Sequence, residues 1–166
     1  MLTLHGQVAR MLHEEHVAVI HLLQRLTALL SQYGPAEPPR ASTVGPLLND
    51  LTAAIETEIA AHFAFEERAL FPVLNANGEG ELSDLYIEEH RAIVPLGATV
   101  ADIARAALRE GFDPQRWAAF HPRAREFADR LTRHAESEEA ALVPLLDDLL
   151  DGEEDDRLAA DRDAAR

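Results

Sequence analysis

One pattern of histidine, glutamate and proline occurs twice in this chain, each time within a stretch that has the apolar periodicity of a helix. Each copy has a histidine, two glutamates four and five residues later, and a proline ten residues later: His62, Glu66, Glu67 and Pro72, then His134, Glu138, Glu139 and Pro144. The copies are 72 residues apart (62 to 134). Because residues i and i+4 lie on the same face of a helix, the repeat predicts two helices with matched polar positions on their apolar faces.

A second, shorter repeat places one more histidine in each half of the chain. Its two copies, 74 residues apart, are Glu14-Glu15-His16 and Glu88-Glu89-His90. The chain thus reads histidine, His-x-x-x-Glu, histidine, His-x-x-x-Glu. Four imidazoles and two carboxylates at matched depths are ligands that two adjacent transition-metal ions need. The candidate metal ligands are His16, His62, Glu66, His90, His134 and Glu138.

Apolar periodicity predicts four long helices, over residues 2–32, 45–74, 82–109 and 114–150. The connections carry Gly-Pro, Pro-Pro and Asn-Gly pairs, and Asp113-Pro114 is a typical helix start. Strand-like alternation of Val, Ile and Thr is absent from the sequence. The predicted fold class is all-α, an antiparallel up-down-up-down four-helix bundle whose halves form a pseudo-twofold internal repeat.

Residues 1–150 are predicted to form this single domain, and residues 151–166 a charged C-terminal tail. The tail is rich in Asp, Glu and Arg and poor in large apolar residues. Such a composition is typical either of a frayed or disordered segment or of a polar helical extension, and both alternatives stay open.

The histidines and glutamates of the repeats stand in register with leucine, isoleucine and alanine, and an ordinary core does not explain them. Burying an unpaired carboxylate costs several kcal/mol. Two of them would remove much of the ~5–15 kcal/mol by which a typical domain is stable. Metal coordination would satisfy all six side chains together. The alternative is an ancient duplication that preserved the helix ends and merely inherited the histidines.

The charge and the residue content exclude several classes of function. A formal net charge of −15 opposes binding to nucleic-acid phosphates and to anionic membranes. The absence of cysteine excludes disulfides, thiolate metal sites and iron–sulfur clusters. No apolar run reaches the ~18 residues of a membrane helix, and residues 1–10 lack a signal-peptide pattern. We therefore expect a soluble, cytoplasmic protein with no nucleic-acid or membrane partner.

Several polar residues beside the candidate ligands have more than one interpretation. Glu67 and Glu139 each follow a candidate ligand by one residue, so they either face solvent or accept an N–H from a ligating imidazole. Tyr86 lies one turn before His90, where it either lines the site and donates a hydrogen bond to a bound ligand or packs in the core. His13 has no counterpart in the other half of the chain and is expected at the surface.

At these residues the chain resembles the hemerythrin-like family, the HHE cation-binding domains, over about residues 1–150. The family has one histidine on the first helix, H-x-x-x-E on the second, one histidine on the third and H-x-x-x-E on the fourth. The resemblance implies a four-helix bundle with two non-haem irons, oxo- or hydroxo-bridged and joined by two carboxylates. It implies bridging by Glu66 and Glu138 and terminal ligation by His16, His62, His90 and His134.

Two positions depart from the oxygen-carrying hemerythrins. Those proteins have a second histidine four residues after the one on the third helix, where this chain has Val94. They also place an aspartate five residues after the last histidine, a position that holds Glu139 in this chain. Glu138 is preferred as the bridge because it mirrors Glu66, but the ambiguity remains. With one histidine fewer, the resemblance implies a more open and more symmetric pair of irons than in an oxygen carrier.

The donor set independently favours iron, since imidazole suits iron, zinc, copper and nickel while bridging carboxylates suit iron and manganese. The predicted function is a di-iron protein that binds or reacts with O2, H2O2 or NO, in sensing, in iron and oxygen handling or in the response to oxidative stress. The alternative is a catalase-like enzyme that decomposes hydrogen peroxide. A purely structural helical protein is the third hypothesis.

Overall fold

The computed structural model describes residues 4–164, and every regular element in that range is helical. The first long segment is α1 (Gln7–Gln32). The second comprises α2 (Ala41–Ala53), η1 (Ala54–Ile59), α3 (Ala60–Phe65), η2 (Glu66–Leu70) and α4 (Phe71–Ala76). The remaining elements are α5 (Gly80–Glu110), α6 (Pro114–Ala140), α7 (Leu142–Leu149) and α8 (Gly152–Ala164). The all-α class is therefore confirmed for the described residues.

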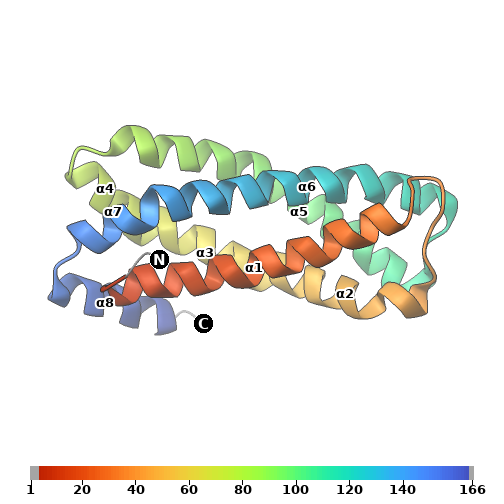
Figure 1. Ribbon diagram of the computed structural model, residues 1–166, viewed down its shortest axis with the longest axis horizontal. Helices are drawn as coiled ribbons and strands as arrows, with labels where there is room; N and C mark the ends of the chain where they lie inside the picture. The colour runs from red at the N-terminus through yellow and green to blue at the C-terminus, as the bar shows by residue number, and fades with distance from the viewer. Residues whose placement is uncertain (1–3, 165–166) are drawn as a thin grey trace.

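Four long helical segments in this described range run side by side along the length of the molecule (Figure 1). They are α1, the α2–α4 segment, α5 and the α6–α7 segment, and each packs against two others. The predicted helix limits agree to within a few residues, except that α1 begins at Gln7. Part of its predicted start, at residues 2–3, lies outside the described residues.

The turn between α5 and α6 follows the expected helix-stop and helix-start chemistry. Gly111 ends α5 with a positive φ of 82°, which glycine adopts without strain because it has no Cβ. Asp113 then caps α6, because its side chain accepts a hydrogen bond from the N–H of Arg116. Pro114 occupies the first turn, where its missing N–H is not needed.

The second long segment contains two π-helical stretches, η1 and η2, and η2 begins at Glu66. The N–H of Phe71 donates to the carbonyl of Glu66, five residues back instead of four. Pro72 follows, and because proline has no N–H, the carbonyl four residues before it lacks its helical partner. Pro144 is its equivalent in the other copy, where the helix is interrupted at Ala141. The repeated prolines thus account for a distortion just after each candidate glutamate.

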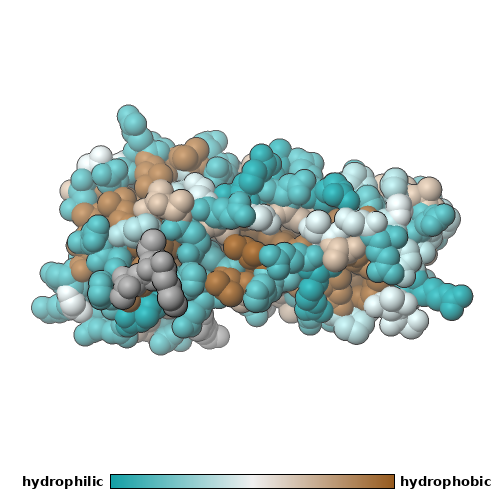
Figure 2. Space-filling model, viewed as in Figure 1, coloured by the Kyte–Doolittle hydropathy of each residue, from teal (hydrophilic) through white to brown (hydrophobic). Residues whose placement is uncertain are grey.

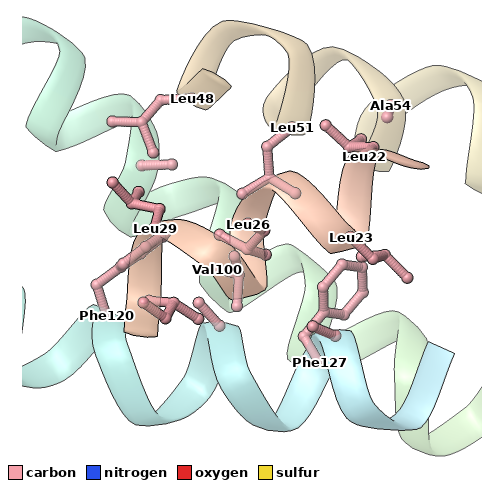
Figure 3. Packing of buried hydrophobic residues seen from close by; sticks show 14 of the residues in the cluster. Leu22, Leu23, Leu26, Leu29, Leu48, Leu51, Ala54, Val100, Phe120 and Phe127 are labelled. Atoms are coloured by element: carbon pink, nitrogen blue, oxygen red, sulfur yellow. The ribbon is translucent and has the colours of Figure 1, made fainter. Parts of the chain in front are cut away.

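Two clusters of buried apolar residues fill the interior, one toward each end of the molecule. Figure 3 shows part of the larger cluster, in which Leu26, Leu51 and Phe127 come from three different segments and point into the same interior. On α1, His16 lies between Leu12 of one cluster and Leu22 of the other. His90, His134 and Glu138 are interposed in the same way, and His62 and Glu66 lie on either side of the boundary between Phe63 of the larger cluster and Phe65 of the smaller one. A polar band therefore separates the two apolar cores.

The face shown in Figure 2 is mostly hydrophilic, with hydrophobic residues gathered along its middle and at its left end. Within residues 4–164, no helix combines the length and the apolar character that crossing a membrane requires.

Residues Gly152–Ala164 form a helix, α8, which is one of the two alternatives left open for the C-terminal segment. This helix packs beside the N-terminal half of α1 (Figure 1). The buried face of α8 carries two apolar and two charged residues, which are Leu158, Ala159, Asp155 and Arg162. The division of the chain into a domain of residues 1–150 and a tail remains a prediction.

Candidate metal centre

All six candidate ligands lie in the interior and converge from all four long segments. Their exposed fractions are 8% for His62, 2% for His16, His90 and His134, and 0% for Glu66 and Glu138. They form two groups whose ligand atoms lie within 4.8 Å of one another: His16, His62, Glu66 and Glu138, and Glu66, His90, His134 and Glu138. The two glutamates belong to both groups.

Each shared carboxylate presents one oxygen to each histidine pair. Glu66 has Oε1 3.1 Å from His62 Nε2 and Oε2 3.4 Å from His90 Nε2. Glu138 has Oε2 3.1 Å from His16 Nε2 and Oε1 3.2 Å from His134 Nε2. This is the arrangement expected of carboxylates that bridge two adjacent ions.

The buried carboxylates of this cluster face imidazole nitrogens as ion-pair partners but make no hydrogen bond within the described residues. None of the four oxygens of Glu66 and Glu138 has a hydrogen-bond partner among the described residues. The facing Nε2 atoms are 3.3 Å apart for His16 and His62, and 3.1 Å apart for His90 and His134. Buried carboxylates without hydrogen bonds are costly, and closely facing imidazole nitrogens need a proton or a cation between them. The donor set therefore fits metal ions in both groups.

The other ring nitrogen of every one of these histidines is held by a second carboxylate. The Nδ1–Oε distances are 2.7 Å for His16–Glu139, 2.6 Å for His62–Glu15, 2.8 Å for His90–Glu67 and 2.7 Å for His134–Glu89. An Nδ1–H that donates to a carboxylate leaves the lone pair of Nε2 for a metal and fixes the plane of the ring.

These outer contacts connect the long segments in a closed ring. Glu15 of α1 holds His62 of α3, and Glu67 of η2 holds His90 of α5. Glu89 of α5 holds His134 of α6, and Glu139 of α6 holds His16 of α1. The N–H acceptor role considered for Glu67 and Glu139 agrees with these contacts. Glu15 and Glu89 were not anticipated. Both residues belong to the repeated Glu-Glu-His triplet, which marks them in the sequence. However, each one accepts from a histidine on a neighbouring segment and not from the histidine of its own triplet.

Glu138 and Glu139 have different places in the structure. Glu138 is fully buried between the histidine pairs, whereas the side chain of Glu139 is 28% exposed and lies on the Nδ1 side of His16. Glu139 also accepts from His13 Nδ1 at 2.7 Å. The surface position expected for His13 is observed, with half of its side chain exposed.

Val94, which stands where the oxygen carriers have their second histidine, does not face the centre. Val94 is 53% exposed and points away from the interior, because position i+4 from His90 falls outside the buried stripe of α5. Tyr86, one turn before His90, is fully buried instead, and its ring centroid is 5.6 Å from that of His134. Its hydroxyl donates to the carbonyl oxygen of Ser137 at 3.2 Å. Tyr86 therefore lines one side of the cluster, while a donor role toward a bound ligand stays a prediction.

The two histidine pairs differ in accessibility. A cavity of about 570 Å³ opens between α1 and the η1–α3 stretch and is lined by both His16 and His62. The other pair is covered by aromatic rings, since Phe63 stacks on His90 with centroids 3.8 Å apart and Phe71 lies 5.8 Å away. The cavity therefore adjoins the His16–His62 pair, whereas aromatic rings pack against His90.

In the metal-free cluster, the shifted pKa values favour protonated histidines beside an ionised Glu138. Burial lowers the pKa of His62, but the carboxylates of Glu66, Glu138 and Glu15 outweigh it and hold this pKa well above 6.5. The pKa values of His16 and His134 are raised as well, again against the effect of burial. Burial raises the pKa of Glu138, but the surrounding imidazoles outweigh it and hold it well below 4.5.

These shifts predict that metal-free protein becomes less stable as the pH rises above 6.5. A histidine whose pKa is raised on folding contributes stability below its unfolded pKa of 6.5, and that stability is lost as the pH passes the folded value. Each 1 kcal/mol lost should lower the melting temperature by ~2–4 °C. Thermal unfolding of chelator-treated protein at about pH 6 and about pH 8.5 measures the effect. His62→Gln should flatten this slope, and a melting temperature that rises over the interval would refute the prediction.

The sequence model of the hemerythrin HHE cation binding domain matches residues 7–146. The matched span contains the six candidate ligands and the four outer glutamates, and it ends before α8. A comparison with curated proteins finds no match. The chain therefore belongs to the hemerythrin HHE cation-binding family, and its buried histidines and glutamates form a cluster that could bind metal.

Proposed function

We propose that this protein is a non-haem di-iron protein that binds or reacts with O2, H2O2 or NO. The observation that carries the proposal is the sharing of Glu66 and Glu138 between two histidine pairs, with all four carboxylate oxygens buried and without hydrogen bonds among the described residues. The two carboxylates would bridge the ions, and each ion would take the Nε2 atoms of one histidine pair as terminal ligands. Imidazole combined with bridging carboxylate favours iron.

We also propose that the four long segments form an antiparallel up-down-up-down bundle with a pseudo-twofold relation between its halves. Support comes from the outer contacts, which occur in equivalent pairs. The equivalent pairs are Glu15–His62 with Glu89–His134, and Glu67–His90 with Glu139–His16. A duplicated half-bundle would produce this correspondence because each contact joins two neighbouring segments.

Two bound irons would supply redox-active positions that bind small oxygen and nitrogen ligands. The chain's own residues hold and orient the ligating atoms, and they control access. The outer carboxylates set the tautomer and the plane of each imidazole. Phe63 shields His90 from water, whereas the cavity leaves His16 and His62 reachable. We expect the small molecule to arrive on the His16–His62 side.

Reconstitution of metal-free protein with Fe²⁺ under argon is expected to give two irons per chain, because there are two complete ligand groups. Elemental analysis after desalting measures the ratio, and exposure to air should produce near-ultraviolet absorption. Less than one iron per chain, or a single zinc ion that iron does not displace, would contradict the proposal.

The reduced, iron-loaded protein is expected to react with O2 or H2O2 without serving as a reversible carrier. The site-facing position one turn before His90 holds Tyr86, so the described centre has four histidines for two ions. The resemblance implies that an oxygen carrier uses at least one more histidine, on its third helix. The test is to mix reduced protein with O2 and then remove it under argon. Full and repeatable recovery of the reduced spectrum would make the protein a carrier.

The alternative function, decomposition of hydrogen peroxide, is favoured by the cavity that leads to the His16–His62 pair. An oxygen electrode would detect O2 released from added peroxide. Release that is lost in His62→Gln but kept in His21→Gln would support the enzyme. Absence of O2 release from protein carrying two irons would leave binding or sensing as the function.

A further inference from the structure

Helix α8 lies outside the span of the family match, yet it is docked closely on α1. Its buried residues Asp155, Leu158, Ala159 and Arg162 follow the spacing i, i+3, i+4 and i+7, which is one face of a helix. Two of these four are charged, and both are nearly fully buried, Asp155 at 6% and Arg162 at 3% exposure. A buried charge is costly unless it is paired, so each of them needs a partner.

Asp155 finds its partner at the start of α1. Its Oδ2 accepts from the N–H of Gln7 at 2.6 Å, and its Oδ1 accepts from the N–H of Val8 at 2.9 Å. These are N–H groups that the helix cannot satisfy internally, and a carboxylate at a helix N-terminus is favourable. The contact anchors the N-terminal part of α8 on α1.

Arg162 finds its partner at the metal centre. Its Nη2 donates to Glu15 Oε1 at 3.0 Å, and the guanidinium lies 5.6 Å from the centroid of the Phe65 ring. The other oxygen of Glu15 accepts from His62 Nδ1 at 2.6 Å. A continuous path of contacts thus runs from α8, through α1, to a candidate ligand on α3.

This path sets one of the four outer carboxylates apart. The side chain of Glu15 is 16% exposed, whereas those of Glu139, Glu89 and Glu67 are 28%, 36% and 46% exposed. Among the described contacts of these four residues, only those of Glu15 include an arginine. Arg162 also lines the cavity beside His16 and His62. The environment of this histidine pair therefore depends on a residue outside the matched domain.

We propose that Arg162 is a positioning residue for the metal centre. By holding Glu15 in place, it fixes the ring of His62 and strengthens binding of the ion on the His16–His62 side. The proposal rests on the proposed metal-binding function. Because outer carboxylates typically contribute ~10–100-fold to metal affinity, loss of Arg162 should weaken one of the two ions several-fold to ~10-fold. The ion held by His90 and His134 should be unaffected.

The experiment measures the affinity of each of the two ions in the full-length protein by competition with a chelator. Arg162→Gln should weaken one ion, and Arg162→Lys should restore part of the affinity because an ammonium can still donate to Glu15. Arg157→Gln is the matched control. Arg157 lies on the same helix with its side chain 59% exposed and pairs with Glu154 and Asp161, away from the centre. Equal loss in both arginine-to-glutamine variants would overturn the proposal.

A double-mutant cycle separates positioning through Glu15 from a general effect of α8 packing. If Arg162 acts through Glu15, then Arg162→Gln should cause little further loss of affinity in a Glu15→Gln background. Additive losses would refute the proposed path. Asp155→Asn loosens the other anchor of α8 without touching Glu15. An equal loss of the same ion in Asp155→Asn would assign the effect to helix docking and overturn the specific role of Arg162.

The wild-type titration distinguishes the two proposals. Wild-type protein that binds no pair of ions would refute the proposed function itself. Wild-type protein that binds two ions, together with an unchanged Arg162→Gln variant, would refute only the role of Arg162.

Discussion

Glu138→Ala is expected to lose most of both metal ions, and Glu66→Ala is expected to behave in the same way. Each carboxylate presents one oxygen to each histidine pair, so its removal takes a ligand from both ions at once. His16→Ala removes one imidazole from one pair and should lose mainly that ion. Metal content per chain after reconstitution with Fe²⁺ and desalting measures the difference. A Glu138→Ala variant that retains one ion fully would show that this carboxylate serves a single position.

Glu139→Ala is the matched control for that comparison, because among the described residues this neighbouring carboxylate holds His16 Nδ1 and His13 Nδ1 and lies outside both ligand groups. It should weaken binding by ~10–100-fold, yet it should still load both ions when Fe²⁺ is in excess. Glu67→Ala should do likewise through His90. Loss of both ions in Glu139→Ala, with retention in Glu138→Ala, would exchange the roles of the two glutamates.

Removal of the metal is expected to lower the melting temperature by ~10 °C near neutral pH. Ligand at 1,000 times its dissociation constant stabilises the folded state by about 4 kcal/mol, and each kcal/mol corresponds to ~2–4 °C for a chain of this size. The physical source is the set of buried carboxylate oxygens that lack hydrogen bonds among the described residues. Raised histidine pKa values compensate only in part, because they matter less as the pH rises.

Thermal unfolding of iron-loaded and chelator-treated protein, followed by circular dichroism, measures this difference. Both samples should be helical at low temperature, because the two apolar clusters lie outside the polar band. Glu138→Ala should melt at the same temperature with and without chelator, which controls for effects of the chelator itself. Coincident curves for wild-type protein whose loading and removal of metal have been verified would contradict a role of these ions in stability.

Local periodicity was sufficient to predict the helices, and the two repeated motifs were sufficient to predict the six residues of the cluster. An i, i+4 spacing places His62 and Glu66 on the same face of their helix, whatever that helix packs against. The same spacing places His134 and Glu138 on one face of theirs. The carboxylates are buried and belong to both ligand groups, as a shared ligand must. The shared helix face follows from backbone geometry within one helix, so it can be read from the sequence, whereas the burial and the sharing are seen only in the packed structure.

Only the tertiary structure decided which residues meet across helices. Glu15 was visible beside His16, but it holds His62, because the rotation and the longitudinal offset of two packed helices determine their contacts. The same reason explains why Val94 faces outward while Tyr86 faces His134.

The charged C-terminal segment illustrates the point most clearly. The sequence determined that residues 151–166 are polar, and polarity alone left a disordered segment and a helical extension equally open. The structure brings Asp155 to the first N–H groups of α1 and Arg162 to Glu15. Both partners lie more than 140 residues earlier in the chain. A buried charge is stable only where a distant partner meets it, and the position of that partner is a property of the packed helices, not of the local sequence.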